Sequence, residues 1–185
     1  MGLGEEASVT ASVVKKAASL AAKKINGFCS DAAFEKELCV SGNYISALAQ
    51  GVTLGAYQFT KYKSEASRSK LQKIYCLGSS VKEKEFKAGT EAARSMAEAV
   101  NLVRDLVNEP PVYLTPSRLA DVASDVANGG RLDCRIFDLA EIRSRGMGGL
   151  IMVSSGSDKE PRFIHLSYRP KKKSKKSVAV VGKGI

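Results

Sequence analysis

The segment SVAVVGKGI, residues 177–185, carries the strongest indication of fold class in this chain. Its run of apolar residues predicts a buried β-strand, Ser177 to Val181, that ends directly at a lysine between two glycines. Glycines let a backbone approach a ligand closely, and α/β sheets bind their ligands at the carboxyl ends of their strands. The segment therefore predicts an α/β sheet that presents Lys183 to a ligand.

Both ends of the chain lack elements that such a sheet requires. No helix follows the predicted last strand, and the first four residues are typical of a strand end and a tight turn. We therefore interpret the chain as part of a longer protein, cut at the threshold of its active site. A plastid or other organellar transit peptide could have been lost with the missing N-terminus.

Composition is that of a globular protein, with 44% hydrophobic residues and no apolar run near the ~20 residues that a membrane span needs. Lysines interrupt the N-terminal apolar stretch, so no signal peptide is visible. The four cysteines lack metal-ligand spacing: Cys29, Cys39, Cys76 and Cys134. We expect them to be free and reduced, in a cytoplasmic protein with no membrane partner.

The formal charge of +10 comes partly from one basic run, Lys171 to Lys176. One interpretation is a patch for nucleic acid or an anionic surface. The other is a solvated connection between two strands of a hairpin. Because no aromatic residues interleave the lysines to stack on bases, the connection is favoured and a nucleic-acid partner is not expected.

Hydrophobic periodicity predicts an alternation of helices and strands. The predicted helices span residues 9–25, 43–59 and 81–108, then one from Thr115 to Gly129 and a short one from Asp138 to Gly146. The predicted strands span residues 71–77, 132–136, 150–154, 162–168 and 177–181. This is an α/β protein in two parts. A partial N-terminal α/β domain, residues 1–96, is linked by the long helix to a second domain, residues 97–185.

Three further features favour ordinary structural roles. Gly2-x-Gly4-x-x-Ala7 fits a loose dinucleotide fingerprint, but the strand that this motif requires does not precede it. His165, the only histidine, lies in an alternating strand and has no paired cysteine or serine. Gly51 and Gly55 fall one turn apart on a predicted helix and indicate close contact between that helix and a sheet.

Several segments together resemble the leucyl (cytosol) aminopeptidase family. RDLVNEPPVYLTP, residues 104–116, is similar to the family's R-D-L-V-N-x-P-x-N-x-L-T-P segment, with Val112 where the family commonly has Asn. LGAYQFTKYK, residues 54–63, resembles L-G-A-Y-x-F-x-x-Y-K, and residues 146–150 and 181–185 match G-M-G-G-L and V-G-K-G-I. These matches occur in the family's order and cover nearly the whole chain.

The resemblance implies a second domain that begins an α/β metallopeptidase domain. It implies a homohexameric enzyme that uses two divalent metal ions (Mn²⁺ or Zn²⁺, with Mg²⁺ also open) to release N-terminal residues from peptides with a free N-terminus. It assigns Lys183 as a metal ligand, and it places every catalytic residue and the other ligands beyond Ile185. An ammonium group has no lone pair, so Lys183 would bind a metal ion only as a neutral amine.

The resemblance also implies that residues 1–185 are inactive by themselves, because one ligand cannot hold two metal ions. The alternative is a non-catalytic α/β module for binding or oligomerisation. The sequence that follows Ile185 separates the two hypotheses, since the family continues with T-F-D-S-G-G.

Overall fold

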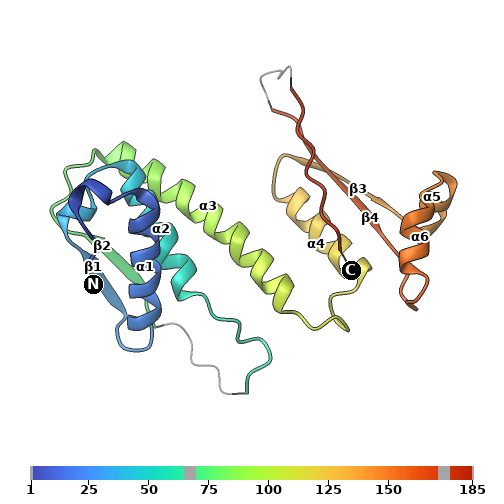
Figure 1. The fold of residues 1–185 in the computed structure, drawn as a ribbon, viewed down its shortest axis with the longest axis horizontal. Helices are drawn as coiled ribbons and strands as arrows, with labels where there is room; N and C mark the ends of the chain where they lie inside the picture. The colour runs from blue at the N-terminus through green and yellow to red at the C-terminus, as the bar shows by residue number, and fades with distance from the viewer. Residues whose placement is uncertain (1, 65–69, 171–175, 185) are drawn as a thin grey trace. The chain divides into compact units, whose positions relative to one another are not determined.

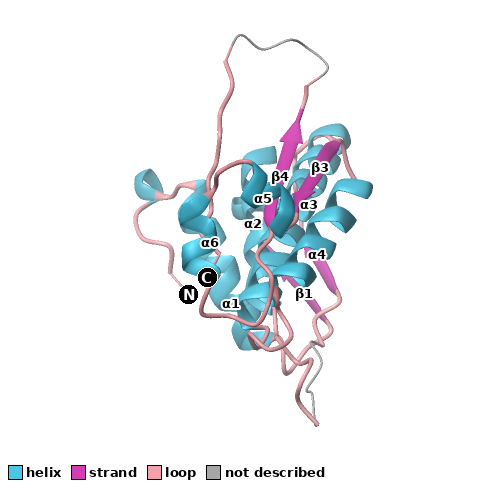
Figure 2. Cartoon of the chain, turned by 90° about the vertical axis from the view of Figure 1, so that its right-hand side faces the viewer, coloured by secondary structure: helices cyan, strands magenta, loops and turns pink. Residues whose placement is uncertain are grey.

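The computed structural model describes residues 2–64, 70–170 and 176–184. It divides into two compact units, unit 1 (Met1–Asn108) and unit 2 (Glu109–Ile185). Helices and strands occur in both, so the predicted two-part α/β fold is confirmed (Figures 1 and 2). No helix in the described part of the chain is long and apolar enough to span a membrane.

The described residues of unit 1 form three α-helices and one pair of strands. In chain order these are α1 (Ala11–Ile25), β1 (Asp31–Phe34), α2 (Gly42–Ala56), β2 (Lys73–Cys76) and α3 (Glu83–Asn108), with single-turn 3₁₀ helices at Glu6–Ser8 and Lys36–Leu38. The strands pair in parallel, with Asp31 opposite Lys73 and Phe34 opposite Cys76. The sequence did not predict β1, because four residues with one acidic member carry no readable alternation.

The core of unit 1 lies between α1 and α2, which run side by side (Figure 1). Val14, Ile45 and Leu48 are at most 2% exposed. A Cβ at Gly51 or Gly55 would collide with a backbone carbonyl oxygen of α1. The two glycines therefore mark a close contact, as predicted, but their partner is a helix and not a sheet.

Where the structure describes unit 2, the chain forms one antiparallel strand pair and three α-helices. Its elements are α4 (Pro116–Asn128), β3 (Leu132–Phe137), α5 (Leu139–Ser144), α6 (Gly148–Ser154) and β4 (Phe163–Tyr168). β3 and β4 pair from Leu132 opposite Tyr168 to Phe137 opposite Phe163. The Thr115 hydroxyl accepts a hydrogen bond from the Arg118 amide, and the Asp138 carboxylate accepts one from the Glu141 amide, so a side chain caps the N-terminus of both α4 and α5.

Two predicted strands are wrong. Residues 150–154 lie in helix α6. The strand was predicted wrongly because a short apolar run does not by itself distinguish a strand from a helix. Residues 177–181 form no strand in the described part of the chain, and their valines are 89–93% exposed. A strand requires a hydrogen-bonded neighbour, and among the described residues the strand pairs are β1 with β2 and β3 with β4. The predicted hairpin connection spans Lys171 to Lys176, and its residues 171–175 fall outside the described residues.

Candidate functional site

Lys183, the predicted metal ligand, lies in the irregular segment 176–184 with its side chain exposed. Among the described residues there is no group of three or more His, Cys, Asp or Glu side chains that could hold a metal ion. The donor set of the described residues therefore does not fit a site for two metal ions. Lys183 is accessible for coordination, but the part of the chain that the structure describes supplies no such group of ligands to join it.

Two other candidates from the sequence, His165 and the Gly2–Ala7 motif, lie on β4 and at the start of unit 1. His165 is exposed on β4, where its register partner is Arg135. Gly4 has a positive φ of 92° and is followed by the 3₁₀ helix Glu6–Ser8, whereas α1 begins only at Ala11. A dinucleotide fingerprint needs a helix directly after its glycines, so the structure gives no support to that motif.

Two of the segments that resemble the aminopeptidase family, residues 54–63 and 104–116, contact each other through residues of unit 1. The Tyr57 hydroxyl, just after α2, donates a hydrogen bond of 2.7 Å to Oδ1 of Asp105 on α3. The Asn108 amide donates to the same hydroxyl over 3.2 Å. Burial first, and the bond to Asp105 second, raise the pKa of Tyr57. The tyrosine of LGAY and the acidic residue of RDLVN thus hold one helix end to another helix.

Arg104 strengthens this contact from the neighbouring position on α3. One of its guanidinium nitrogens donates to the Leu54 carbonyl oxygen over 2.8 Å, which satisfies a carbonyl in the last turn of α2. The guanidinium carbon also lies 5.2 Å from the centre of the Tyr57 ring, within the range of a cation–π interaction. Three residues of the RDLVN segment, Arg104, Asp105 and Asn108, therefore make structural contacts within unit 1.

A second contact fixes the other end of α2. The backbone amide of Gly42, the first residue of α2, donates to Oε1 of Glu85 on α3 over 2.7 Å. A carboxylate at a helix N-terminus is favoured by the helix dipole. Helix α3 therefore binds α2 near its beginning and near its end. Neither contact was predicted, because single-sequence reasoning does not identify partners 43 or 48 residues apart.

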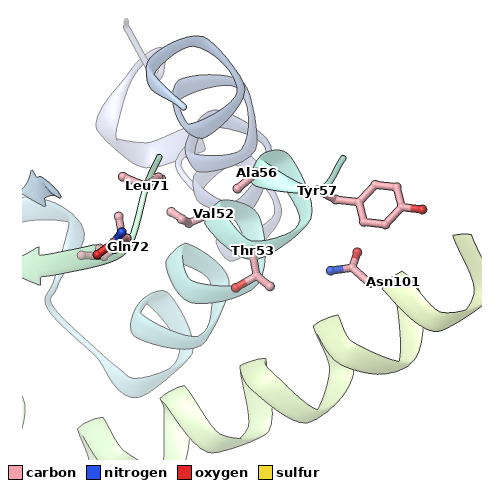
Figure 3. A pocket seen from close by; sticks show the side chains of 8 residues that line it. Val52, Thr53, Ala56, Tyr57, Leu71, Gln72 and Asn101 are labelled. Atoms are coloured by element: carbon pink, nitrogen blue, oxygen red, sulfur yellow. The ribbon is translucent and has the colours of Figure 1, made fainter. Parts of the chain in front are cut away.

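An open cavity of about 380 Å³ lies beside the Tyr57 contact. It is lined by Val52, Thr53, Ala56, Tyr57, Leu71, Gln72, Ile74 and Asn101. Figure 3 shows Tyr57 and Asn101 at one end, and Leu71 and Gln72 at the other. The Tyr57 hydroxyl and the Asn101 side-chain oxygen are already hydrogen-bonded to Asp105 and Arg104. The cavity therefore presents few free polar groups to a ligand.

In unit 2, two arginines pack on one aromatic ring. The guanidinium carbons of Arg135 and Arg145 lie 4.5 and 4.8 Å from the centre of the Phe137 ring. Arg135 also pairs with Glu141 over 2.9 Å. Phe137 itself is 6% exposed and meets Phe163 edge to face. This cluster holds α5 against the end of β3 and was not predicted.

Two family models match the chain, in the order of its two units. The N-terminal domain of the cytosol aminopeptidase family matches residues 1–66, and the catalytic domain of that family matches residues 101–185. The division between units 1 and 2 lies within the second match, after Asn108. The boundary near Ala97 remains a prediction.

Individual relatives agree with these models. A probable cytosol aminopeptidase of Rhodococcus opacus (strain B4) is 34% identical over all of this chain, and one of Wolinella succinogenes is 42% identical over 76% of it. These alignments cover 37% and 30% of the relatives, so the chain spans less than two fifths of their length.

Solved structures agree as well. A mutant of tomato leucine aminopeptidase matches 96% of the chain and 37% of its own, with a TM-score of 0.84 and 25% identity. The bottromycin maturation enzyme BotP, in complex with Mn, matches 92% of the chain and 36% of its own, with a TM-score of 0.76 and 29% identity. Domain order, motifs and fold agree, and this chain belongs to the cytosol aminopeptidase family.

Proposed function

We propose that the protein is a leucyl-type metalloaminopeptidase, a hydrolase that releases N-terminal residues from peptides. The observation that carries this proposal is the match to both family domains in the family's order, ending at the V-G-K-G-I segment that contains Lys183. We further propose a cytoplasmic homohexamer that requires two divalent metal ions. The BotP structure with Mn supports a divalent metal in a similar fold.

Lys183 would supply one neutral amine to the metal site. The remaining ligands would come from residues after Ile185 in a protein as long as the relatives. A divalent metal pair supplies, when bound, the polarisation of the scissile carbonyl and the activation of water. Residues 1–185 contribute the accessible amine at Lys183 and the packed domain before it. Since the described donors do not fit a complete site, we propose that residues 1–185 alone are inactive.

The protein extended to the length of its relatives tests the activity. It should release leucine from a chromogenic leucine amide when Mn²⁺ or Zn²⁺ is added, and a chelator should abolish the release. Residues 1–185, purified and supplied with the same ions, should show none. An extended protein without metal-dependent release would favour the non-catalytic module for binding or oligomerisation.

Lys183→Ala in the extended protein tests the ligand. Turnover at saturating Mn²⁺ or Zn²⁺ should fall sharply, and the bound metal per subunit should fall with it, while the hexamer remains. Lys183→Arg should fail almost as badly, because a guanidinium stays protonated and cannot coordinate. Lys176→Ala, in the same irregular segment, is the matched control and should leave both readouts unchanged. Full metal occupancy and near-normal turnover in both Lys183 variants would reject the ligand assignment.

A further inference from the structure

Two of the four cysteines lie together in unit 1. Cys39 ends the 3₁₀ helix Lys36–Leu38 and is 0% exposed, while Cys76 is the last residue of β2 and is half-buried. Phe34 connects them: it is the register partner of Cys76, and its carbonyl oxygen lies 4.0 Å from the Cys39 sulfur. The same oxygen accepts a hydrogen bond of 2.9 Å from the Leu77 amide.

A further contact holds Cys39 to the chain that follows β2. The Ser79 hydroxyl donates a hydrogen bond of 2.8 Å to the Cys39 carbonyl oxygen. Cys39 is therefore tied to the residues after Cys76 through Phe34 and through Ser79. Burial first, and the neighbouring Cys76 thiol second, raise the pKa of Cys39 to about 12. The geometry and the interaction of the two thiols agree that the side chains are neighbours.

We propose that Cys39 and Cys76 form a reversible intramolecular disulfide when the protein meets a hydroperoxide. Neither cysteine belongs to the segments that carry the aminopeptidase proposal, so this inference does not depend on that activity. The two thiols differ in access: the oxidant reaches the half-buried Cys76, whereas the fully buried Cys39 is protected from it. Oxidation therefore begins at Cys76 and is resolved by Cys39.

The reaction balances with hydrogen peroxide as the oxidant. The Cys76 thiolate attacks one peroxide oxygen, the O–O bond breaks, and Cys76 becomes a sulfenic acid. The other oxygen leaves as hydroxide and takes up the proton that the Cys76 thiol released, which gives water. The Cys39 sulfur then attacks the Cys76 sulfur, the S–S bond forms and the S–O bond breaks. The Cys39 proton leaves with the departing hydroxide as a second water. The two thiols lose two electrons, and one peroxide is reduced.

The bond would tie the residues before α2 to the end of β2. The loop that it closes contains the whole of α2, half of the α1–α2 core. Such a cross-link restricts the unfolded chain and raises resistance to unfolding. Oxidation would therefore make unit 1 harder to unfold, and reduction would reverse the change.

Peptide mass spectrometry tests the pairing. The chain is treated with hydrogen peroxide, remaining thiols are alkylated under denaturing conditions, and the digest is searched for linked peptides. The wild type should yield a Cys39–Cys76 peptide that dithiothreitol removes. Cys76→Ser should abolish it. Cys29→Ser and Cys134→Ser are matched controls, since both cysteines are also half-buried, and they should retain it.

Thermal unfolding supplies the second readout. Oxidation should raise the Tm of the wild type and of both control variants by several degrees, and it should leave the Tm of Cys76→Ser unchanged. Because Cys39 is fully buried, Cys39→Ala could unfold the protein, so the test rests on Cys76→Ser. Overoxidation of Cys76 with Cys39 still alkylated, a cross-link to Cys29 or Cys134, or an unchanged wild-type Tm would each overturn the proposal.

Discussion

Units 1 and 2 differ in how completely each buries its own apolar side chains. Among its described residues, unit 1 has a contiguous core of eight buried side chains, contributed mainly by α1 and α2. In unit 2 the buried hydrophobic residues are three alanines of α4 with Phe137 and Ile142, whereas Met152 is 73% exposed. Yet the glycine-flanked Lys183 belongs to unit 2. The residue that the family resemblance singles out therefore lies in the unit that buries fewer of its own apolar side chains.

Truncation of a core side chain gives the largest expected difference between the units. Ile45, on α2, is 1% exposed, and Ile45→Ala should lower the free energy of unfolding of unit 1 by about 2–5 kcal/mol. Met152→Ala, on the exposed face of α6, should change stability by less than about 0.5 kcal/mol. Hydrogen exchange of α2 and α6 peptides measures each unit by itself. Equal effects would contradict the contrast in packing.

Replacing a glycine by alanine should change the free energy of unfolding in opposite directions in the two units. Gly55→Ala should destabilise unit 1 by about 1–3 kcal/mol, since its new methyl group would push α2 away from α1. Gly149→Ala, in α6, meets no atom within 4 Å and should be neutral or stabilise its helix by up to about 1 kcal/mol. Urea unfolding of both variants provides the measurement, and a stabilising Gly55→Ala would show that the helices separate easily.

The smallest expected effect is at the contact between α2 and α3. Tyr57→Phe removes the hydroxyl that donates to Asp105 and should cost about 1 kcal/mol at neutral pH. Because the folded-state pKa of Tyr57 is raised, the wild type should lose stability as the pH rises above the unfolded value of about 10. The variant should lack that alkaline loss. Tyr75→Phe, whose hydroxyl makes only a long bond of 3.5 Å, is the control.

Local signals in the sequence predicted most of the helices. Thr115 before Pro116 specifies the start of α4, because the hydroxyl and the proline ring act on adjacent residues. The same reasoning failed at Leu150–Ser154, where four apolar residues fit a strand and a helix equally well. It also failed at residues 177–181, because a strand forms only when it pairs with another strand, and a local sequence pattern does not identify that partner.

The site could be predicted only in part. The resemblance singled out Lys183, but the structure leaves that side chain exposed and without a donor cluster, so its role stays a proposal. The roles of Tyr57 and Asp105 could not be predicted, since their contact joins residues 48 apart. Similarly, the proximity of Cys39 and Cys76 depends on the pairing of β1 with β2, and β1 could not be predicted from the sequence.

The two hydrogen-bonded contacts of α3 with α2 fix the length of α3 that must separate Glu85 from Asp105. Glu85 and Asp105 are separated along α3 by about 30 Å, and they bind residues at opposite ends of α2. One residue added or removed between them would turn one contact by about 100° relative to the other. Both contacts could not then form together. The stretch of α3 between Glu85 and Asp105 therefore does not tolerate the insertion or deletion of a single residue. Insertions in this part of the chain would be tolerated only in the loops before and after α3.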